Sequence, residues 1–142
     1  MMIQQISVFL ENKKGRLAFI TKVLAQAGAD IRAMSVADTS DFGILRLIVD
    51  DPEKAIEAIK NEGMAVSLTE VLAIGVEDTP GGLAKATNAL WDSGISVEYA
   101  YAFISQKDGT AFVILRVDDN EKAVEVLKEN NITVIEQDDI HK

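Results

Sequence analysis

The chain has 142 residues, an apolar content of 48%, a formal net charge of −9 and no cysteine. Its length fits one domain or two very small ones. Nucleic-acid binding is disfavoured because an acidic surface repels phosphate backbones, and the lack of cysteine excludes disulfides, a thiolate metal site and a cysteine nucleophile.

Targeting and catalytic signals are also missing. No basic segment followed by an apolar run opens the sequence, and no stretch approaches the roughly 20 apolar residues of a membrane span. We therefore expect a cytoplasmic protein that does not contact a membrane. The single histidine, His141, is next to the last residue, where chains are usually poorly ordered. We accordingly expect no catalytic residue, no metal and no cofactor.

The sequence repeats itself. Residues 50–60 (DDPEKAIEAIK) return as residues 118–128 (DDNEKAVEVLK), 68 positions later (118 − 50). Upstream, Gly15 returns as Gly81, 66 positions later (81 − 15). Two residues are therefore inserted between these blocks in the second copy.

The repeat predicts two units, residues 1–70 and 71–142. A unit of about 70 residues is marginal for an independent core, so the units are expected to pack on each other or on a second chain.

The first unit begins with alternating apolar residues, which are typical of a strand. Gly28 is expected to end the first helix, and Asp51 followed by Pro52 to start the second. The predicted elements in chain order are a strand at 3–10, a helix at 15–27, strands at 30–37 and 43–49, a helix at 52–62 and a strand at 65–68.

The second unit follows the same order. Thr79 is predicted to cap a helix that begins at Pro80, and Asp119 to cap the last helix. Asn131 stands where the first unit has Gly63, and asparagine tolerates a left-handed cap well. The predicted strands are 71–76, 96–105, 111–117 and 132–135.

The order β-α-β-β-α-β predicts an α+β fold. We expect two ferredoxin-like units in tandem, each an antiparallel sheet with its helices on one face. Leu45, Leu47 and Val49 should face those helices. Trp91 is expected to be buried.

The loop before the first helix of each unit suits a zwitterion. A helix N-terminus has unpaired N–H groups and partial positive charge. Gly15 and Gly81 lack a Cβ, so a carboxylate can approach those groups. Asn12 or Asp78 offers an oxygen to an ammonium, and Asp78 gives the charged contact. The alternative is a routine turn and cap without a ligand.

The tandem order and the glycine-leucine loops resemble the ACT domain, over nearly the whole chain. The second unit has the fuller motif, Asp78-Thr79-Pro80-Gly81-Gly82-Leu83 and then Gly94-Ile95-Ser96-Val97. The first is looser, Asn12-Lys13-Lys14-Gly15-Arg16-Leu17 and then Gly28-Ala29-Asp30-Ile31.

This resemblance implies regulatory modules that bind amino acids where two units pair side by side. The pocket would lie between the first-helix loop of one unit and the start of the second strand of the other. The expected ligand-binding residues are Asn12, Lys14, Gly15, Arg16, Leu17, Asp30 and Ile31 in the first unit and Asp78, Pro80, Gly81, Gly82, Leu83, Ser96, Val97 and Tyr99 in the second.

The leading interpretation is an allosteric amino-acid sensor without a catalytic domain. It would form a homodimer and act on an unidentified protein partner. Because Asn12 and Lys14 depart from the motif, the first unit's site is expected to be altered or empty, and Arg16 is either a cation for the ligand or a solvated helix residue. The alternatives are a ligand-free oligomerisation scaffold and an acylphosphatase-like hydrolase that would use Asn12 and Arg16.

Overall fold

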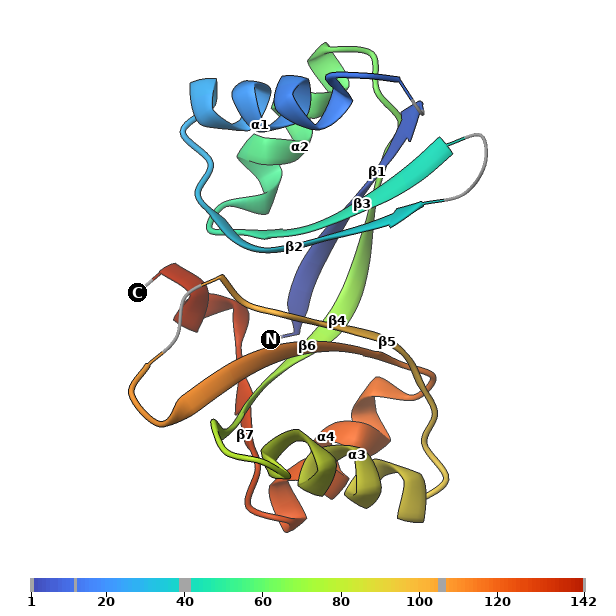
Figure 1. Cartoon of the computed structure of the whole chain (residues 1–142), viewed down its shortest axis with the longest axis vertical. Helices are drawn as coiled ribbons and strands as arrows, with labels where there is room; N and C mark the ends of the chain where they lie inside the picture. The colour runs from blue at the N-terminus through green and yellow to red at the C-terminus, as the bar shows by residue number, and fades with distance from the viewer. Residues whose placement is uncertain (1, 12, 39–41, 105–106, 142) are drawn as a thin grey trace. The chain divides into compact units, whose positions relative to one another are not determined.

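The structure, a computed structural model, describes residues 2–11, 13–38, 42–104 and 107–141. Contacts between residues divide the chain into two compact units (Figure 1). We call them the N-terminal unit, Gln4–Thr69 with Ile140–Lys142, and the C-terminal unit, Glu70–Asp139 with Met1–Ile3.

The N-terminal unit is a sheet with two helices on one face (Figure 1). Its strand order is β2-β3-β1-β4, and β3 is antiparallel to both β1 and β2. Leu45, Leu47 and Val49 belong to the core under the helices, as predicted. The elements are β1 (Ile3–Glu11), α1 (Arg16–Gln26), β2 (Ile31–Asp38), β3 (Phe42–Val49), α2 (Pro52–Asn61) and the beginning of β4 (Val66–Glu77).

The C-terminal unit repeats this plan. Its strand order is β5-β6-β4-β7, with β6 antiparallel to β4 and β5 and β7 antiparallel to β4. A second core, which includes Leu72, Ile74 and Leu90, fills the space under the helices. After β4 come α3 (Gly82–Asp92), β5 (Val97–Ala102), β6 (Thr110–Val117), α4 (Asn120–Glu129), β7 (Thr133–Ile135) and the short 3₁₀ helix η1 (Gln137–His141). The predicted α+β class, with two tandem ferredoxin-like units, is confirmed.

The repeat of the sequence is a repeat of structure. Helices α1 and α3 begin 66 residues apart (82 − 16), whereas α2 and α4 begin 68 apart (120 − 52), as do β3 and β6 (110 − 42). The two extra residues therefore lie between β5 and β6. The caps repeat as well, since Asp51 accepts a hydrogen bond from the Lys54 amide at 3.3 Å and Asp119 accepts one from the Lys122 amide at 3.1 Å.

The strand β4 corrects one prediction. The sequence predicted separate strands at 65–68 and 71–76, but the structure has one strand of 12 residues from Val66 to Glu77. No glycine or proline interrupts the chain between Val66 and Ile74, and the leucine, threonine and valine residues of this stretch favour extended backbone. Nothing in the local sequence therefore ends the first strand.

The starts of the first helices also differ from the prediction. Helices were expected from residues 15 and 80, but they begin at Arg16 and Gly82. Gly15 and Gly81 have φ of 81° and 87°, in the left-handed region, so neither belongs to a right-handed helix. Thr79 does not cap α3, which has no side-chain cap.

Trp91 is exposed rather than buried, with 73% of its surface accessible. Leu90 and Ala86 form the buried side of α3. The position after Leu90 is turned about 100° around the helix axis, away from that side. The helical periodicity that places Ala86 and Leu90 on the buried side of α3 would have predicted that Trp91 is exposed.

None of the helices in the described part of the chain has both the length and the apolar character needed to cross a membrane.

Candidate functional site

A cavity of about 350 Å³ lies at the N-terminal end of α3 in the C-terminal unit. Three parts of the chain that are distant in sequence meet there: the end of β4 with the turn and first residues of α3, the start of β6, and the connection from α4 to β7. The lining residues are 75–77, 79–82, 85, 110 and 131–133.

The turn before α3 is built by glycine. The Gly82 amide donates to the Thr79 carbonyl at 3.0 Å, and Gly81 has φ 87° and ψ −5°. These angles are those of the third residue of a type II turn, where proline is common one position earlier, as Pro80 is here. Pro80 is therefore a turn residue and not the first residue of the helix.

The neighbouring residue, Gly82, is required for a different reason. A Cβ at this position would lie 1.9 Å from the carbonyl oxygen of Glu77. Only glycine allows the start of α3 to approach the end of β4 so closely.

The cavity carries opposite charges. Glu77 and Lys85 both line it, and both are exposed. Neither side chain has an ion pair or a hydrogen bond with another described residue. The amides of Leu83 and Ala84 also lack a partner within the described part of the chain, as expected in the first turn of a helix. This end of the unit thus offers a carboxylate, an ammonium and helix-terminal donors.

The N-terminal unit has an equivalent cavity of about 290 Å³ at the start of α1. It is lined by residues 9–11, 16 and 62–65. Phe9 corresponds to Gly75 and Arg16 to Gly82, 66 positions later (75 − 9, 82 − 16), and Gly63 corresponds to Asn131, 68 positions later (131 − 63). The repeat therefore forms the same hollow twice.

The charges of the two cavities differ. In the N-terminal unit, Glu11 pairs with Lys13, whose Nζ lies 2.8 Å from its carboxylate, and with Arg16, whose Nη2 lies 4.0 Å away. The hydrogen bond from Lys13, then the charges of Lys13 and Arg16, hold the pKa of Glu11 below its usual value. The guanidinium of Arg16 also lies 6.0 Å from the centre of the Phe19 ring. This carboxylate is thus neutralised from within the unit.

The structure places the predicted loop residues as follows. Pro80, Gly81 and Gly82 line the larger cavity, and Arg16 lines the smaller one. Lys14 and Gly15 form the turn before α1, and Asn12 lies outside the described residues. The exposed residues Asp78, Leu17 and Leu83 line neither cavity.

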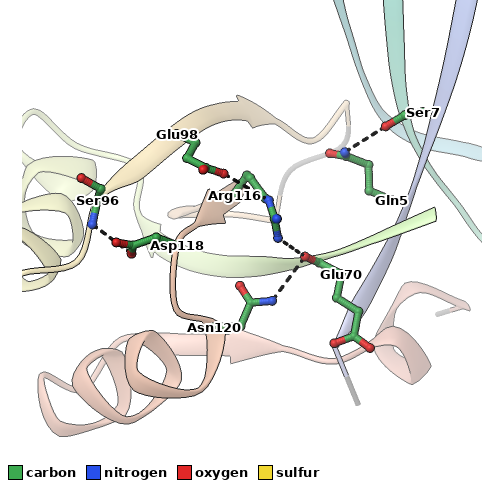
Figure 2. A network of polar contacts seen from close by, with 8 residues as sticks. All are labelled: Gln5, Ser7, Glu70, Ser96, Glu98, Arg116, Asp118 and Asn120. Carbon is green, nitrogen blue, oxygen red and sulfur yellow. Dashed lines mark hydrogen bonds and ion pairs between the residues drawn. The ribbon is translucent and has the colours of Figure 1, made fainter. Parts of the chain in front are cut away.

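The predicted residues around the start of β2 and β5 line neither cavity. The Asp30 amide donates to Asp50 Oδ1 at 2.8 Å, and the Ser96 amide donates to Asp118 Oδ1 at 3.2 Å, the second of which is drawn in Figure 2. Ile31 and Val97 are the first residues of β2 and β5. These two amides are therefore already satisfied inside their own units.

Tyr99 also lies away from the cavity. Its ring stacks on Tyr101 with centroids 6.5 Å apart, on the strand next to β6. Figure 2 shows the polar contacts of the same strand pair, in which Arg116 binds the Glu98 carboxylate at 3.2 Å and the Glu70 carbonyl at 3.2 Å. Asn120 donates to the same carbonyl at 3.3 Å. These contacts join β4, β5, β6 and the start of α4 within the unit.

Sequence reasoning missed Glu77 and Lys85. A signal for Glu77 was present, because the repeat has glutamate at both equivalent positions, 11 and 77. Lys85 lies four positions after Gly81, on the same side of α3. Asn131 was interpreted only as a cap, which it is, with φ 60°, but it also lines the cavity.

No group of three or more metal-binding side chains is found in residues 2–11, 13–38, 42–104 and 107–141.

Comparison with solved structures identifies a whole-length relative. Protein BT0572 from Bacteroides thetaiotaomicron is 40% identical, with a TM-score of 0.93 over 100% of this chain and 97% of that one. The ligand-free regulatory subunit of aspartate kinase from Thermus thermophilus shares the fold at 17% identity, with a TM-score of 0.69 over 92% and 93% of the two chains. The corresponding subunit from Thermus flavus is 18% identical, with a TM-score of 0.65 over 92% of each chain.

No curated protein matches the sequence. Among protein families, the one described as an ACT domain pair matches residues 1–142. The chain therefore belongs to the ACT domain family, as an ACT domain pair.

Proposed function

We propose that this protein is a regulatory module that binds a free amino acid at the N-terminal end of α3. The observation that carries the proposal is the cavity of about 350 Å³ in which Glu77 and Lys85 both lack a protein partner among the described residues. An α-amino acid carries the ammonium and the carboxylate that complement these two charges. Membership of the ACT domain family supports the proposal, because that family resemblance implies regulatory amino-acid binding.

The helix terminus adds to the binding of the carboxylate. Unpaired amides at a helix N-terminus favour a negative group. The turn at Gly81 brings the start of α3 to the rim of the cavity. A carboxylate bound there would meet both Lys85 and the positive end of the helix.

The proposal also includes the protein on which this regulatory module acts. Two proteins with the same fold are regulatory subunits of an enzyme, aspartate kinase. We propose that this chain likewise acts on a separate protein partner, as a homodimer. A ligand position at the interface between two units stays a prediction.

A thermal-shift screen with each of the twenty amino acids tests the proposal. Ligand at 100 times Kd stabilises the folded state by about 2.7 kcal/mol, which raises the melting temperature by several degrees. The N-acetyl and the amide derivative of the active amino acid are the matched controls. Each derivative lacks one charge and should bind much more weakly.

A screen in which no amino acid shifts the melting temperature would reject the proposal and favour a ligand-free oligomerisation scaffold. Equal binding of the N-acetyl derivative would show that the ammonium is not recognised.

Asp78 follows Glu77 directly and is exposed, so we propose that its charge also favours an ammonium near this loop. Asp78→Ala should weaken binding, and its matched control Asn12→Ala should weaken it less. Because Asp78 does not line the cavity, the difference should stay below about 1.5 kcal/mol, the lower end for direct contacts with charged groups. Titration calorimetry on both variants measures it, and a larger loss in Asn12→Ala would assign the main site to the N-terminal unit.

A further inference from the structure

We propose that only the C-terminal unit binds the amino acid, with Glu77 receiving the ligand's ammonium and Lys85 its carboxylate. In the N-terminal unit, Lys13 and Arg16 take the place of the ligand's cation. This inference rests on the proposed function and assigns its chemistry to one of two equivalent cavities.

The two equivalent carboxylates differ in their ion pairs. Glu11 and Glu77 end their strands 66 positions apart (77 − 11) and line equivalent cavities. Glu11 is bound by Lys13 at 2.8 Å and approached by Arg16 at 4.0 Å. A ligand ammonium would compete with these cations at Glu11, whereas it meets an unpaired carboxylate at Glu77.

This difference between Glu11 and Glu77 originates in the loop residues that follow each strand. Thr79 replaces Lys13, and Gly82 replaces Arg16, at the positions 66 residues later (79 − 13, 82 − 16). Gly82 cannot carry a side chain, because a Cβ would lie 1.9 Å from the Glu77 carbonyl oxygen. The backbone of the C-terminal loop thus excludes an equivalent of Arg16, and Thr79 supplies no cation at the position of Lys13.

The two units also differ in the cation available to the ligand's carboxylate. Lys85 replaces Phe19 at the position 66 residues later (85 − 19). In the N-terminal unit the Phe19 ring lies 6.0 Å from the Arg16 guanidinium, which also lines the smaller cavity. In the C-terminal unit the same position supplies a cation that lines the larger cavity. Both cavities thus hold a carboxylate and a cation, but only in the C-terminal unit do both lack a partner among the described residues.

Titration calorimetry tests the assignment, with each of the twenty L-amino acids in turn as the probe. We expect one ligand per chain. Glu77→Gln should raise Kd roughly 10- to 100-fold, since contacts with charged groups are worth about 1.5–3 kcal/mol. The matched variant Glu11→Gln should leave Kd and stoichiometry unchanged.

Lys85→Met provides a second variant that keeps an unbranched chain, and it should also weaken binding. Circular dichroism and the melting temperature of each variant without ligand show whether the fold is retained. Two ligands per chain, or a loss of affinity in Glu11→Gln but not in Glu77→Gln, would overturn this assignment while the proposed function stands. Absence of binding for all twenty probes would overturn both.

Discussion

The N-terminal and C-terminal units form the same turn before their first helix but surround it with different charges. Gly15 and Gly81 have nearly the same left-handed conformation, with φ of 81° and 87°. The neighbouring positions change from Lys13, Lys14, Arg16 and Phe19 to Thr79, Pro80, Gly82 and Lys85. The backbone plan therefore depends on the shared glycine, and the chemistry of the cavity depends on the residues around it.

The comparison shows how a duplicated fold can diverge without a change in architecture. Both units keep their core, their antiparallel sheet and their helix caps. One unit neutralises its rim carboxylate at Glu11, and the other leaves Glu77 unpaired within the described residues. Mutations at equivalent positions should separate what the units share from what distinguishes them.

The largest difference is expected at Gly82. A Gly82→Val side chain would collide with the Glu77 carbonyl, because its Cβ would lie 1.9 Å from that oxygen. We expect a loss of about 3 kcal/mol in the free energy of unfolding, toward the upper end for overpacked sites. The matched Arg16→Val should cost less than 1 kcal/mol, about its difference in helix propensity. Urea unfolding followed by circular dichroism measures both, and equal losses would show that the two loops do not differ in backbone approach.

The next effect should be the same in both units. Gly15→Ala and Gly81→Ala place a Cβ in open space, with no atom within 4 Å, but at positive φ. The left-handed conformation costs a residue with a Cβ about 1–2 kcal/mol. Both variants should therefore lose about this amount of unfolding free energy. A loss confined to one unit would mean that the turn of the other unit can rearrange to relieve the strain. The same backbone strain would affect any larger side chain at Gly81. A loss of ligand binding in such a variant would therefore not show that the ligand lies next to Gly81.

A smaller, equal effect is expected at the second-helix caps. Asp51 and Asp119 each accept a hydrogen bond from the amide three residues on. Asp51→Ala and Asp119→Ala should each lower the free energy of unfolding by about 1 kcal/mol. Chemical denaturation of the single and double variants checks this. Losses in the double variant that add would confirm two independent caps, whereas a much smaller loss at one site would mean that its helix start is held by other contacts.

The smallest effect concerns the ion pair at Glu11. The pKa of Glu11 is lowered by its hydrogen bond with Lys13, by the charge of Lys13 and by that of Arg16. Because the folded pKa lies below the unfolded one, the small contribution to stability is present above the ordinary pKa of glutamate and is lost as pH falls through the folded pKa. Lys13→Ala should raise the pKa of Glu11 toward its usual value.

Carbon-13 NMR of the side-chain carboxyls, recorded against pH, measures that pKa. Lys14→Ala is the matched control, since Lys14 has no ion pair with Glu11. An unchanged titration of Glu11 in Lys13→Ala would mean that Lys13 does not hold the carboxylate in solution.

Much of the fold was predictable from local sequence. The alternation around Leu45 and Leu47 and the cap signal of Asp51 and Pro52 identified their elements, because each depends on residues only a few positions apart. The repeat then transferred the same order to the second unit. Local patterns were less informative at β4. The prediction divided this single strand into two, although no glycine or proline marks an end between Val66 and Ile74.

The site was only partly predictable. The turn glycines Gly15 and Gly81 were identified from their motif, and both adopt the left-handed conformation. Their motif did not show that Gly82 also approaches Glu77, because that contact depends on how the loop closes between β4 and α3. Lys85 was overlooked because its position in the cavity depends on which segment, residues 131–133, lies beside the start of α3.

The sequence by itself therefore determined the two ferredoxin-like units, the caps of their second helices and the loops that carry the left-handed glycine, since all of these follow from periodicity and short motifs. Only the tertiary structure decided where the cavity lies. It forms because β7 pairs with β4, Gly75 opposite Thr133, and thereby brings residues 131–133 to the start of α3. Contacts between residues more than 50 positions apart depend on sheet pairing and packing, which no short window of sequence contains.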